Sequence, residues 1–230
     1  MSDTLAFDIY GTLIDTQGIT GMLEKHAGHN SGAFSLLWRQ KQLEYSFRRG
    51  LMQLYRDFDV CTVQALDYAL LTFGIFLSPA EKNELLEKYR ALPVFEDVTE
   101  SLEQSRKAGF RVFAFSNGKP SDIEQLLVHA GIREFFIDII SVDEVQSFKP
   151  DPAVYRHFLE KTASKPEHAW LVSSNPFDIL GAVAVKMKAV WVQRSPSIIM
   201  DPWEFTPTLT VKKMDEMTAA IQSWKNRQGS

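Results

Sequence analysis

The stretch Phe7-Asp8-Ile9-Tyr10-Gly11-Thr12-Leu13 carries an acidic side chain out of an apolar run and into a glycine turn. The run Leu5–Ile9 predicts a buried strand, because short apolar runs that end at turn residues are typical of strands covered on both faces. Asp8 then lies at a strand end, where a carboxylate can act as a nucleophile. If other strands run parallel to this one, their ends bring further side chains to the same edge.

Short apolar runs rich in β-branched and aromatic residues recur along the chain and predict more buried strands. With the first run, they are Leu5–Ile9, Arg111–Ser116, Ile137–Ser141, Ala169–Ser173, Ala189–Gln193 and, more weakly, Thr208–Val211. Most intervals are amphipathic helical segments with end signals. These signals are a capping box at Ser121-Asp122-Ile123-Glu124, an N-cap at Asp151-Pro152, and Gly109 and Gly131 after helices. The alternation predicts an α/β fold with a doubly wound, mostly parallel, Rossmann-like sheet.

The first interval breaks this rhythm, since Thr16 to about Pro93 contains no convincing strand. It indicates several helices, one of which opens with a capping box at Ser78-Pro79-Ala80-Glu81. We therefore expect a core domain of residues 1–15 and 94–230, with a helical cap of residues 16–93 inserted after the first strand. Such a cap lies where it can close over a site at the strand ends. The last residues, 226–230, are expected to fray.

The composition favours small-molecule partners over nucleic acid or membranes. The 230 residues are 45% hydrophobic, and 25 basic against 29 acidic residues give a net charge of -4 without blocks of like charge. No apolar stretch approaches the roughly 20 residues of a membrane-spanning helix. Cys61 is the single cysteine, and the N-terminus lacks the pattern of a signal peptide, so we expect a cytoplasmic location.

Polar residues follow four of the predicted strands in a distinctive order. The four sets are Asp8 with Tyr10 and Thr12, Ser116-Asn117-Gly118, Lys149-Pro150-Asp151, and Ser173-Ser174-Asn175-Pro176-Phe177-Asp178. If the sheet is parallel, all four converge at one edge. In order and spacing they resemble the four motifs of the haloacid dehalogenase superfamily, and the resemblance covers the chain from Leu5 to Asp178.

Two positions depart from the metal-dependent phosphatases of that superfamily, which carry Asp-x-Asp in the first motif. Tyr10 stands where those enzymes have their acid/base aspartate, and a tyrosine with a pKa of about 10 is a poor base near neutrality. Ser174 stands where they have a metal-binding aspartate. Asp-x-Tyr is the pattern of the superfamily's dehalogenases, so we expect no metal and no cofactor.

The remaining residues suit displacement at a saturated carbon. Asp8, with a reference pKa of about 3.9, needs no base to activate it, and a nearby Lys149 would favour the ionised form further. Attack would leave an ester on Asp8, and water must then attack the carboxyl carbon of that ester with the help of a base and of oxyanion donors. We assign the base to Asp178, oriented by Ser173, Asn175 and Lys149.

The segment Trp38-Arg39-Gln40-Lys41-Gln42-Leu43-Glu44-Tyr45 is similar to the part of L-2-haloacid dehalogenases that extends from the cap into the active site. The resemblance implies that Arg39 binds the departing halide with Asn117 and an aromatic wall, and that Tyr155 supports Lys149. It implies that Thr12, Ser116 and the amides after Asp8 hold the substrate carboxylate. The implied pocket lining is Tyr10, Gln40, Leu43, Phe58 and Phe177, where related dehalogenases often carry tryptophan in place of Phe177. It also implies a homodimer.

The sequence thus predicts hydrolytic, metal-independent conversion of short (S)-2-haloalkanoic acids to (R)-2-hydroxy acids and halide, with inversion at C2. Two alternatives stay open at this point: a magnesium-dependent phosphatase of the same superfamily, and a catalytically silent protein used for protein contacts. Release of phosphate from an aryl phosphate, with and without a chelator, distinguishes the phosphatase from the dehalogenase. Turnover of 2-chloropropionate would exclude the catalytically silent protein.

Each residue also has a simpler structural interpretation. Asp8 is suited to forming a turn, Arg39 to a solvated helix face and Lys149 to flanking a helix start. Ser173 and Asn175 are suited to capping the next helix, and Asp178 to its first turn. The five histidines show no spacing typical of metal ligands.

Overall fold

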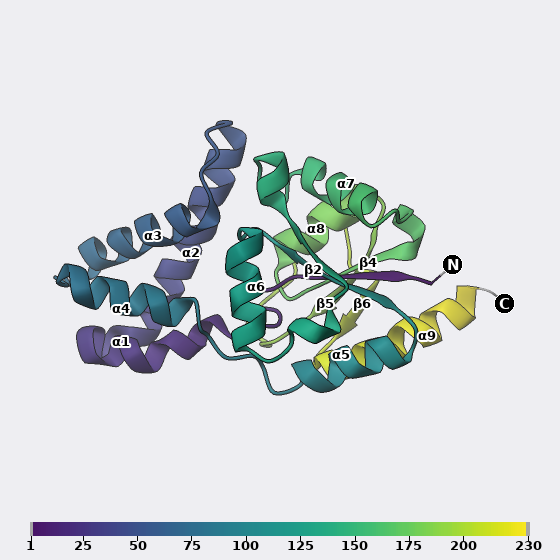
Figure 1. Ribbon diagram of the computed structural model, residues 1–230, viewed down its shortest axis with the longest axis horizontal. Coiled ribbons are helices and arrows are strands. Elements are labelled where there is room, and N and C mark those ends of the chain that lie inside the picture. Colours follow the sequence, from purple (N-terminus) through teal and green to yellow (C-terminus); the bar gives the residue numbers. More distant parts are fainter. Residues whose placement is uncertain (1, 229–230) are drawn as a thin grey trace.

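The computed structural model describes residues 2–228, and in this range the chain forms a six-stranded, wholly parallel sheet with the order β3-β2-β1-β4-β5-β6 (Figure 1). The strands are β1 (Thr4–Phe7), β2 (Arg111–Ser116), β3 (Asp138–Ser141), β4 (Ala169–Ser173), β5 (Lys188–Val192) and β6 (Leu209–Val211). Each begins and ends within two residues of a predicted run. The predicted doubly wound α/β fold is confirmed.

Helices cover both faces of the sheet because alternate strand residues point to opposite sides. Leu5 and Phe7 belong to one buried cluster, with residues of α5 (Val98–Lys107), α6 (Pro120–His129) and α9 (Met217–Gln228). Ala6 belongs to the other, with residues of α7 (Pro152–Lys161) and α8 (Pro176–Ala184). Strands β1 to β5 therefore contribute apolar side chains to both clusters, which explains why they appear in the sequence as continuous apolar runs, whereas the edge strand β6 contributes to the first cluster only.

The helix ends agree with the sequence signals at most places. Ser78 makes the predicted capping box, the Asp151 side chain accepts from the N–H of Ala153, and Gly109 and Gly131 have positive φ after their helices. The capping box at Ser121 is wrong: the N-cap is Lys119 and α6 begins at Pro120, two residues before the predicted start, because proline is well suited to a first helical position. The predicted fraying from Asn226 is also wrong as far as Gln228, where α9 ends, and residues 229–230 lie outside the described range.

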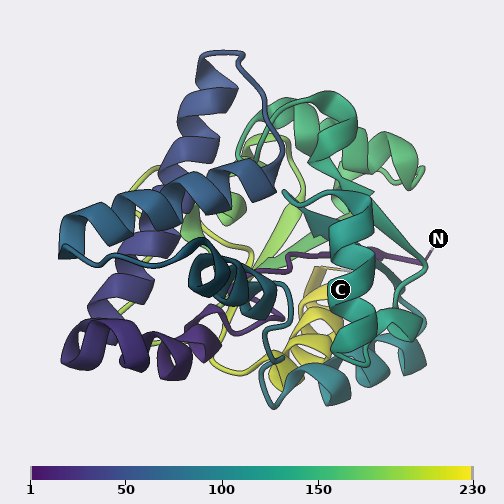
Figure 2. The ribbon, with the colours of Figure 1, turned by 60° about the vertical axis from the view of Figure 1, so that its left-hand side comes forward.

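The chain between β1 and α5 is helical, as predicted, and lies beside the carboxyl ends of the strands (Figures 1 and 2). It contains α1 (Thr20–Ala27), α2 (Ser31–Leu51), α3 (Phe58–Phe73) and α4 (Pro79–Tyr89). It leaves and rejoins the core at one place, since the N–H of Asp15 donates to Pro93 over 2.8 Å and that of Phe95 donates to Leu13 over 3.0 Å. The short 3₁₀ helices of the described chain are Thr16–Ile19, Gly28–Asn30, Arg133–Phe135, Val142–Val145, Pro166–His168 and Met214–Glu216.

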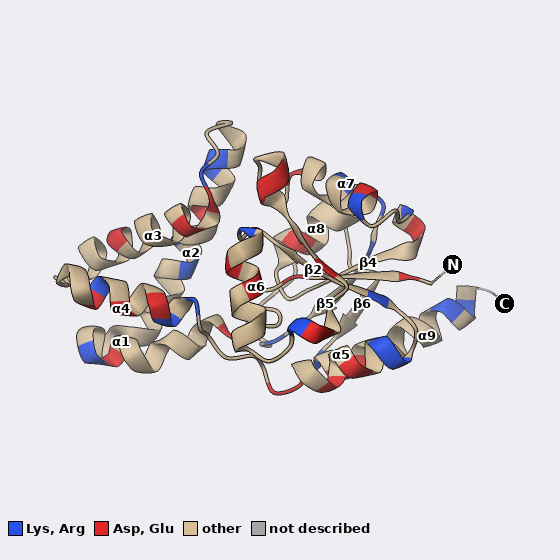
Figure 3. Ribbon diagram, viewed as in Figure 1, with Lys and Arg blue, Asp and Glu red and all other residues tan. Residues whose placement is uncertain are grey.

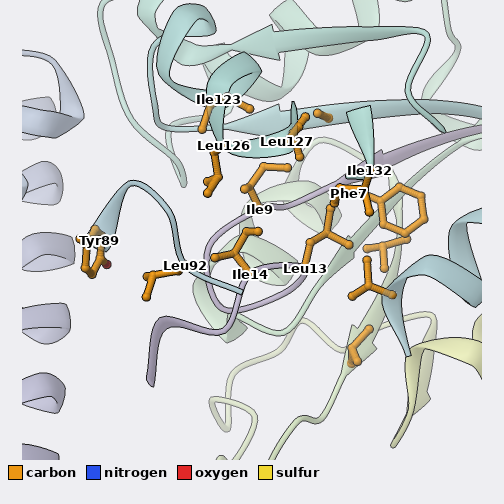
Figure 4. Packing of buried hydrophobic residues seen from close by; sticks show 14 of the residues in the cluster. Phe7, Ile9, Leu13, Ile14, Tyr89, Leu92, Ile123, Leu126, Leu127 and Ile132 are labelled. Carbon is orange, nitrogen blue, oxygen red and sulfur yellow. The ribbon is translucent and has the colours of Figure 1, made fainter. Parts of the chain in front are cut away.

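The loop after β1 is fixed by its own apolar side chains. Ile9, Leu13 and Ile14 are fully buried, and they pack between α6 and the returning chain at Leu92 (Figure 4). Since these residues follow Asp8 directly, their packing sets the position of the acid.

Acidic and basic residues are interspersed along the ribbon in Figure 3, and no helix carries residues of one sign over its whole length. Within residues 2–228, no helix combines the length and the apolar character that crossing a membrane requires.

Candidate active site

Asp8 lies at the carboxyl end of β1, where crossover connections diverge to β2 on one side and β4 on the other. Open α/β sheets bind ligands at such a switch point, because the connecting loops leave a crevice there. The N–H of Asp8 donates to the carbonyl of Val172 over 3.0 Å, so the backbone of the acid is still held by β4. Its side chain is only 11% exposed.

Four side chains hold the Asp8 carboxylate. Oδ1 accepts from Lys149 Nζ at 3.1 Å. Oδ2 accepts from Thr12 Oγ1 at 2.7 Å, from Asn175 Nδ2 at 2.7 Å and from Ser173 Oγ at 3.3 Å. Three donors occupy Oδ2 and one occupies Oδ1, so the two oxygens are not equivalent.

The turn after Asp8 is shaped by Gly11, which has a φ of +84° that side-chain-bearing residues rarely adopt. Its carbonyl accepts a short hydrogen bond from Ser174 Oγ. The N–H of Ser174 donates to Thr12 Oγ1 at 2.9 Å, and the Thr12 hydroxyl donates in turn to Asp8 Oδ2. Ser174 thus serves the turn at the position where related phosphatases place a metal ligand.

Lys149 joins Asp8 to Asp178. Its Nζ donates to Asp178 Oδ2 at 2.9 Å and to the carbonyl of Phe115 at 2.9 Å, and it lies 4.1 Å from the centre of the Phe115 ring. The side chain is 1% exposed. A buried ammonium needs partners of this kind, because removing it from water is costly unless charge and hydrogen bonds compensate.

Asp178 is fully buried in the first turn of α8, and Tyr155 of α7 donates to its Oδ1 at 2.7 Å. Burial raises the pKa of Asp178 above its ordinary value, Lys149 opposes that rise, and the negative charge of Asp8 adds to it. Burial and the charge of Asp178 in turn raise the pKa of Tyr155, which stays a donor. A carboxyl with a raised pKa is a better proton acceptor once it is ionised.

Ser116 and Asn117 lie at the end of β2, next to these charges. Asn117 Oδ1 accepts from the N–H of Lys149 at 3.0 Å, which leaves the amide nitrogen of Asn117 as a donor. Ser116 Oγ accepts from the N–H of Gly118 at 3.1 Å, which leaves its own O–H to donate. Both side chains are buried and can offer hydrogen bonds to an anion.

Arg39 reaches the core from α2. Its guanidinium donates to the carbonyl of Tyr10 at 3.2 Å and to Gln42 Oε1 at 2.6 Å. Gln42 is fully buried and also binds Thr62 and Tyr89. A network within the helical segment therefore holds a cation against the loop that follows Asp8.

Aromatic rings line the approach on the same side. The Tyr10 ring stacks on Tyr89 and lies 6.0 Å from the Phe58 ring, centre to centre. Burial, and then the neighbouring Tyr89, raise the pKa of Tyr10, so its hydroxyl does not serve as a base. Phe177 is half-buried, with its ring 5.0 Å from that of Phe47.

Comparisons with known proteins agree with this geometry. A model of the haloacid dehalogenase-like hydrolase family matches residues 2–186. The chain belongs to this family.

Its relatives include an (S)-2-haloacid dehalogenase of Pseudomonas sp. (strain YL), 33% identical over 94% of this chain and 95% of the relative. (S)-2-haloacid dehalogenase 1 of Pseudomonas sp. (strain CBS-3) is 39% identical over 82% of this chain and 83% of the relative. The solved structure of L-2-haloacid dehalogenase from Xanthobacter autotrophicus with chloropropionic acid covalently bound superposes with a TM-score of 0.90. Its identity is 28%, over 96% of this chain and 99% of the other.

Within this haloacid dehalogenase-like hydrolase, two predicted placements need correction. Gln40 is exposed and does not line the site, because on a helix it lies opposite the buried positions Trp38 and Gln42. Tyr155 supports Asp178 rather than Lys149, since its hydroxyl donates to that carboxylate. Leu43 is half-buried on the same side of α2 as Arg39.

Two residues of the site were missed in the sequence. Gln42 occupies the buried stripe of α2, four residues after Trp38. A polar residue on an otherwise apolar stripe is the sequence signal that could have indicated its role. Gly181 lies inside α8, where a Cβ would come within 2.4 Å of Tyr155 Oη, so glycine allows Tyr155 to reach Asp178. The sequence signal that could have indicated Gly181 is a glycine in a helix interior, three residues after Asp178.

The metal-binding side chains of the described chain do not gather into a site: residues 2–228 contain no cluster of three His, Cys, Asp or Glu suited to an ion. Lys149 occupies the place between Asp8 and Asp178. Carboxylates are the usual ligands of magnesium, and here the two that come close are bridged by an ammonium.

Proposed function

We propose that this protein is an (S)-2-haloacid dehalogenase that hydrolyses short (S)-2-haloalkanoic acids to (R)-2-hydroxy acids and halide. One observation carries the proposal: Asp8 is bound by Lys149 and three neutral donors, with Tyr10 in place of a second acid. This arrangement stabilises an ionised carboxylate and supplies no proton to a leaving group. Halide is a leaving group that needs none.

In the first step, Asp8 Oδ1 attacks C2 of the substrate, the C2–halogen bond breaks, and C2 inverts once. Oδ1 is assigned to the attack because a single donor engages it, whereas three donors occupy Oδ2. Arg39 and Asn117 bind the departing halide. Ser116 and the amides after Asp8 bind the substrate carboxylate, and alignment of the reacting atoms supplies much of the rate.

In the second step, Asp178 takes a proton from water, which attacks the carboxyl carbon of the Asp8 ester. Thr12, Ser173 and Asn175 stabilise the negative charge that develops on Oδ2. The Thr12 hydroxyl is already donated to Asp8, so we assign Thr12 to this role rather than to the substrate carboxylate. The bond between the carboxyl carbon and the ester oxygen then breaks, and the leaving oxygen takes the proton held by Asp178, which returns to its ionised form. The product leaves as the hydroxy acid with an oxygen atom from Asp8.

Neither step uses a metal or a cofactor. Tyr10 and Ser174 replace the two acids that a phosphatase of this superfamily would need, and both are engaged elsewhere, in aromatic packing and in the Gly11 turn.

We further propose that residues 16–93 act as a cap on a core of residues 1–15 and 94–230. Polar contacts between the two parts support this, since Tyr55 donates to Asp143 at 2.7 Å and Lys119 pairs with Asp57 at 2.8 Å. A homodimer and a cytoplasmic location stay predictions.

The test is release of halide from resolved (S)- and (R)-2-chloropropionate, with and without a chelator. We expect turnover of the (S) form only, unchanged by the chelator, and its loss in Asp8→Asn. Asp138→Asn, the same change at an exposed position of the same sheet, is the matched control and should retain activity. Magnesium-dependent release of phosphate from an aryl phosphate, without halide release, would contradict the proposal.

An isotope experiment tests the ester. During a single turnover in oxygen-18 water, the product hydroxyl should carry ordinary oxygen, because that atom comes from Asp8. Predominant label in this first product would mean that water attacks C2 directly.

A further inference from the structure

A cavity of about 660 Å³ lies between the C-terminal end of α2 and the core. Its lining is mainly apolar: Phe47, Leu51, Phe148, Phe177, Leu180 and Trp203. Two residues of the lining, Leu51 and Trp203, are 88% and 63% exposed, so the cavity borders solvent on their side. The cavity is thus an apolar passage that opens to solvent.

Two residues of the candidate active site also belong to the lining of this cavity. Lys149 and Phe177 line it, and the Nζ of Lys149 is 3.1 Å from Asp8 Oδ1. Phe177 forms the wall together with Phe47, whose ring is 5.0 Å away. The cavity and the candidate active site therefore share these two residues.

The polar groups of the lining are not arranged for a second charged group. Ser46 Oγ donates to the carbonyl of Leu43 at 2.8 Å, and Ser147 Oγ donates to Asp151 at 2.6 Å. Lys149 is engaged by Asp8 and Asp178. Asp201 contributes a negative charge to the lining, which disfavours an anionic end group. The occupant that fits is an uncharged hydrocarbon chain.

We propose that this cavity receives the alkyl chain of the substrate, so that the enzyme prefers (S)-2-haloalkanoic acids longer than 2-halopropionate. The inference rests on the proposed dehalogenase function and names its substrate class. A volume of this order suits ligands well above the size of a three-carbon acid. Each methylene that leaves water on binding strengthens the interaction by an amount equivalent to about a fourfold change in an equilibrium constant.

The test measures kcat/KM for (S)-2-chloro acids of three, four, six and eight carbons. We expect an increase of roughly fourfold for each added methylene up to the length at which the chain fills the cavity. A decrease from the three-carbon acid onward would overturn the inference and leave the dehalogenase function standing. No halide release from any acid would overturn both.

Gly50 offers a variant that narrows the cavity. It lines the wall near the end of α2, and a Cβ added there would meet Ser147 Oγ only at 3.8 Å, an ordinary contact. We expect Gly50→Leu to lower kcat/KM for the six-carbon acid by about tenfold and to change the value for the three-carbon acid by less than about twofold. Gly32→Leu is the matched control, since Gly32 lies on the same helix with no neighbour within 4 Å of an added Cβ.

Trp203 offers a second variant at the exposed mouth. Trp203→Ala removes apolar surface where only the far end of a long chain reaches, so we expect a loss of about fivefold with the eight-carbon acid and none with the three-carbon acid. Equal losses for all chain lengths would overturn the inference. The inference would also be overturned if Trp203→Ala changed the oligomeric state, measured by light scattering, but left the chain-length preference unchanged. The cavity would then be part of an interface between copies of the chain.

Discussion

Two aspartates at opposite ends of β1 lie in contrasting environments. Asp3 precedes the strand and Asp8 follows it, they are 2% and 8% exposed, and each is paired with a lysine. At Asp3 that lysine is Lys225 of α9, at 3.0 Å, and its side chain is 43% exposed. At Asp8 it is Lys149, at 3.1 Å, with 1% exposure.

The hydrogen bonds at the amino end of β1 favour the ionised acid. Burial alone would raise the pKa of Asp3, but hydrogen bonds from Lys225 and Trp170 outweigh burial, and its pKa is lowered. A lowered pKa in the folded state means that ionised Asp3 stabilises the fold above its ordinary pKa, and that this contribution is lost as the pH falls through the lowered value.

The carboxyl end of β1 has the opposite balance. Two carboxylates, Asp8 and Asp178, share one buried ammonium, so negative charge is in excess, and the pKa of Asp178 is raised by burial and by Asp8. Stability gained through protonated Asp178 is present at low pH and is lost as the pH rises through the raised pKa. The ionised acid at the amino end of β1 thus stabilises the fold at neutral pH, whereas ionisation of Asp178 near the carboxyl end lowers the stability of the fold.

The largest effect should come from Asp178→Asn. The variant keeps a hydrogen-bonding side chain of the same size but removes the base, so attack by Asp8 proceeds and hydrolysis of the ester slows by about a thousandfold. Mass spectrometry of the protein after incubation with (S)-2-chloropropionate should show a covalent adduct. An unmodified protein with near-normal turnover would show that Asp178 is not the base.

A smaller effect is expected from Gly181→Ala. The new methyl group would lie 2.4 Å from Tyr155 Oη, so the ring must shift away from Asp178. We expect a loss of about 1–3 kcal/mol in the free energy of unfolding and about a tenfold loss of turnover. Urea unfolding and halide release measure the two. If neither the free energy of unfolding nor the turnover changed, the added methyl group would have been accommodated by a movement of α7 away from α8 that costs no free energy.

Tyr155→Phe should act mainly on the pH profile. The hydroxyl of Tyr155 lowers the pKa of Asp178 by donating to the ionised form, so its removal raises that pKa further. Asp178 must be ionised to act as a base, and the acid limb of kcat should therefore move to higher pH. Turnover at pH 8 should fall only a few-fold. If the acid limb of kcat stayed at the wild-type pH, the ionisation of Asp178 would not be the cause of that limb.

The smallest effect on turnover should come from Asp3→Asn, less than about twofold. The same variant should lower the free energy of unfolding at pH 7 by about 1–3 kcal/mol, since charge-assisted hydrogen bonds from Lys225 and Trp170 are weakened. The difference from wild type should shrink as the pH falls below 3.8, the ordinary pKa of the acid. A large loss of turnover would mean that the two ends of β1 are coupled.

Much of the site was predictable because its residues follow strand ends, and a parallel sheet brings strand ends together. Asp8, Ser116 and Ser173 each lie at or directly after the end of a strand, as their sequence positions indicated. Prediction was weaker for the helical segment, where the exposure of a residue depends on the rotation of its helix. Gln40 was assigned to the site and Gln42 was not, although two positions on a helix are separated by 200°.

The sequence by itself determined the strands, the helical insertion and the acid at the end of the first strand, because apolar runs and turn residues act locally. Only the tertiary structure decided that Lys149 lies between Asp8 and Asp178, with Nζ at 3.1 and 2.9 Å from their oxygens. It also decided that Tyr155 binds Asp178 across the space that Gly181 leaves. Such contacts join residues far apart in the chain, and their distances depend on how helices and strands pack, which no local pattern encodes.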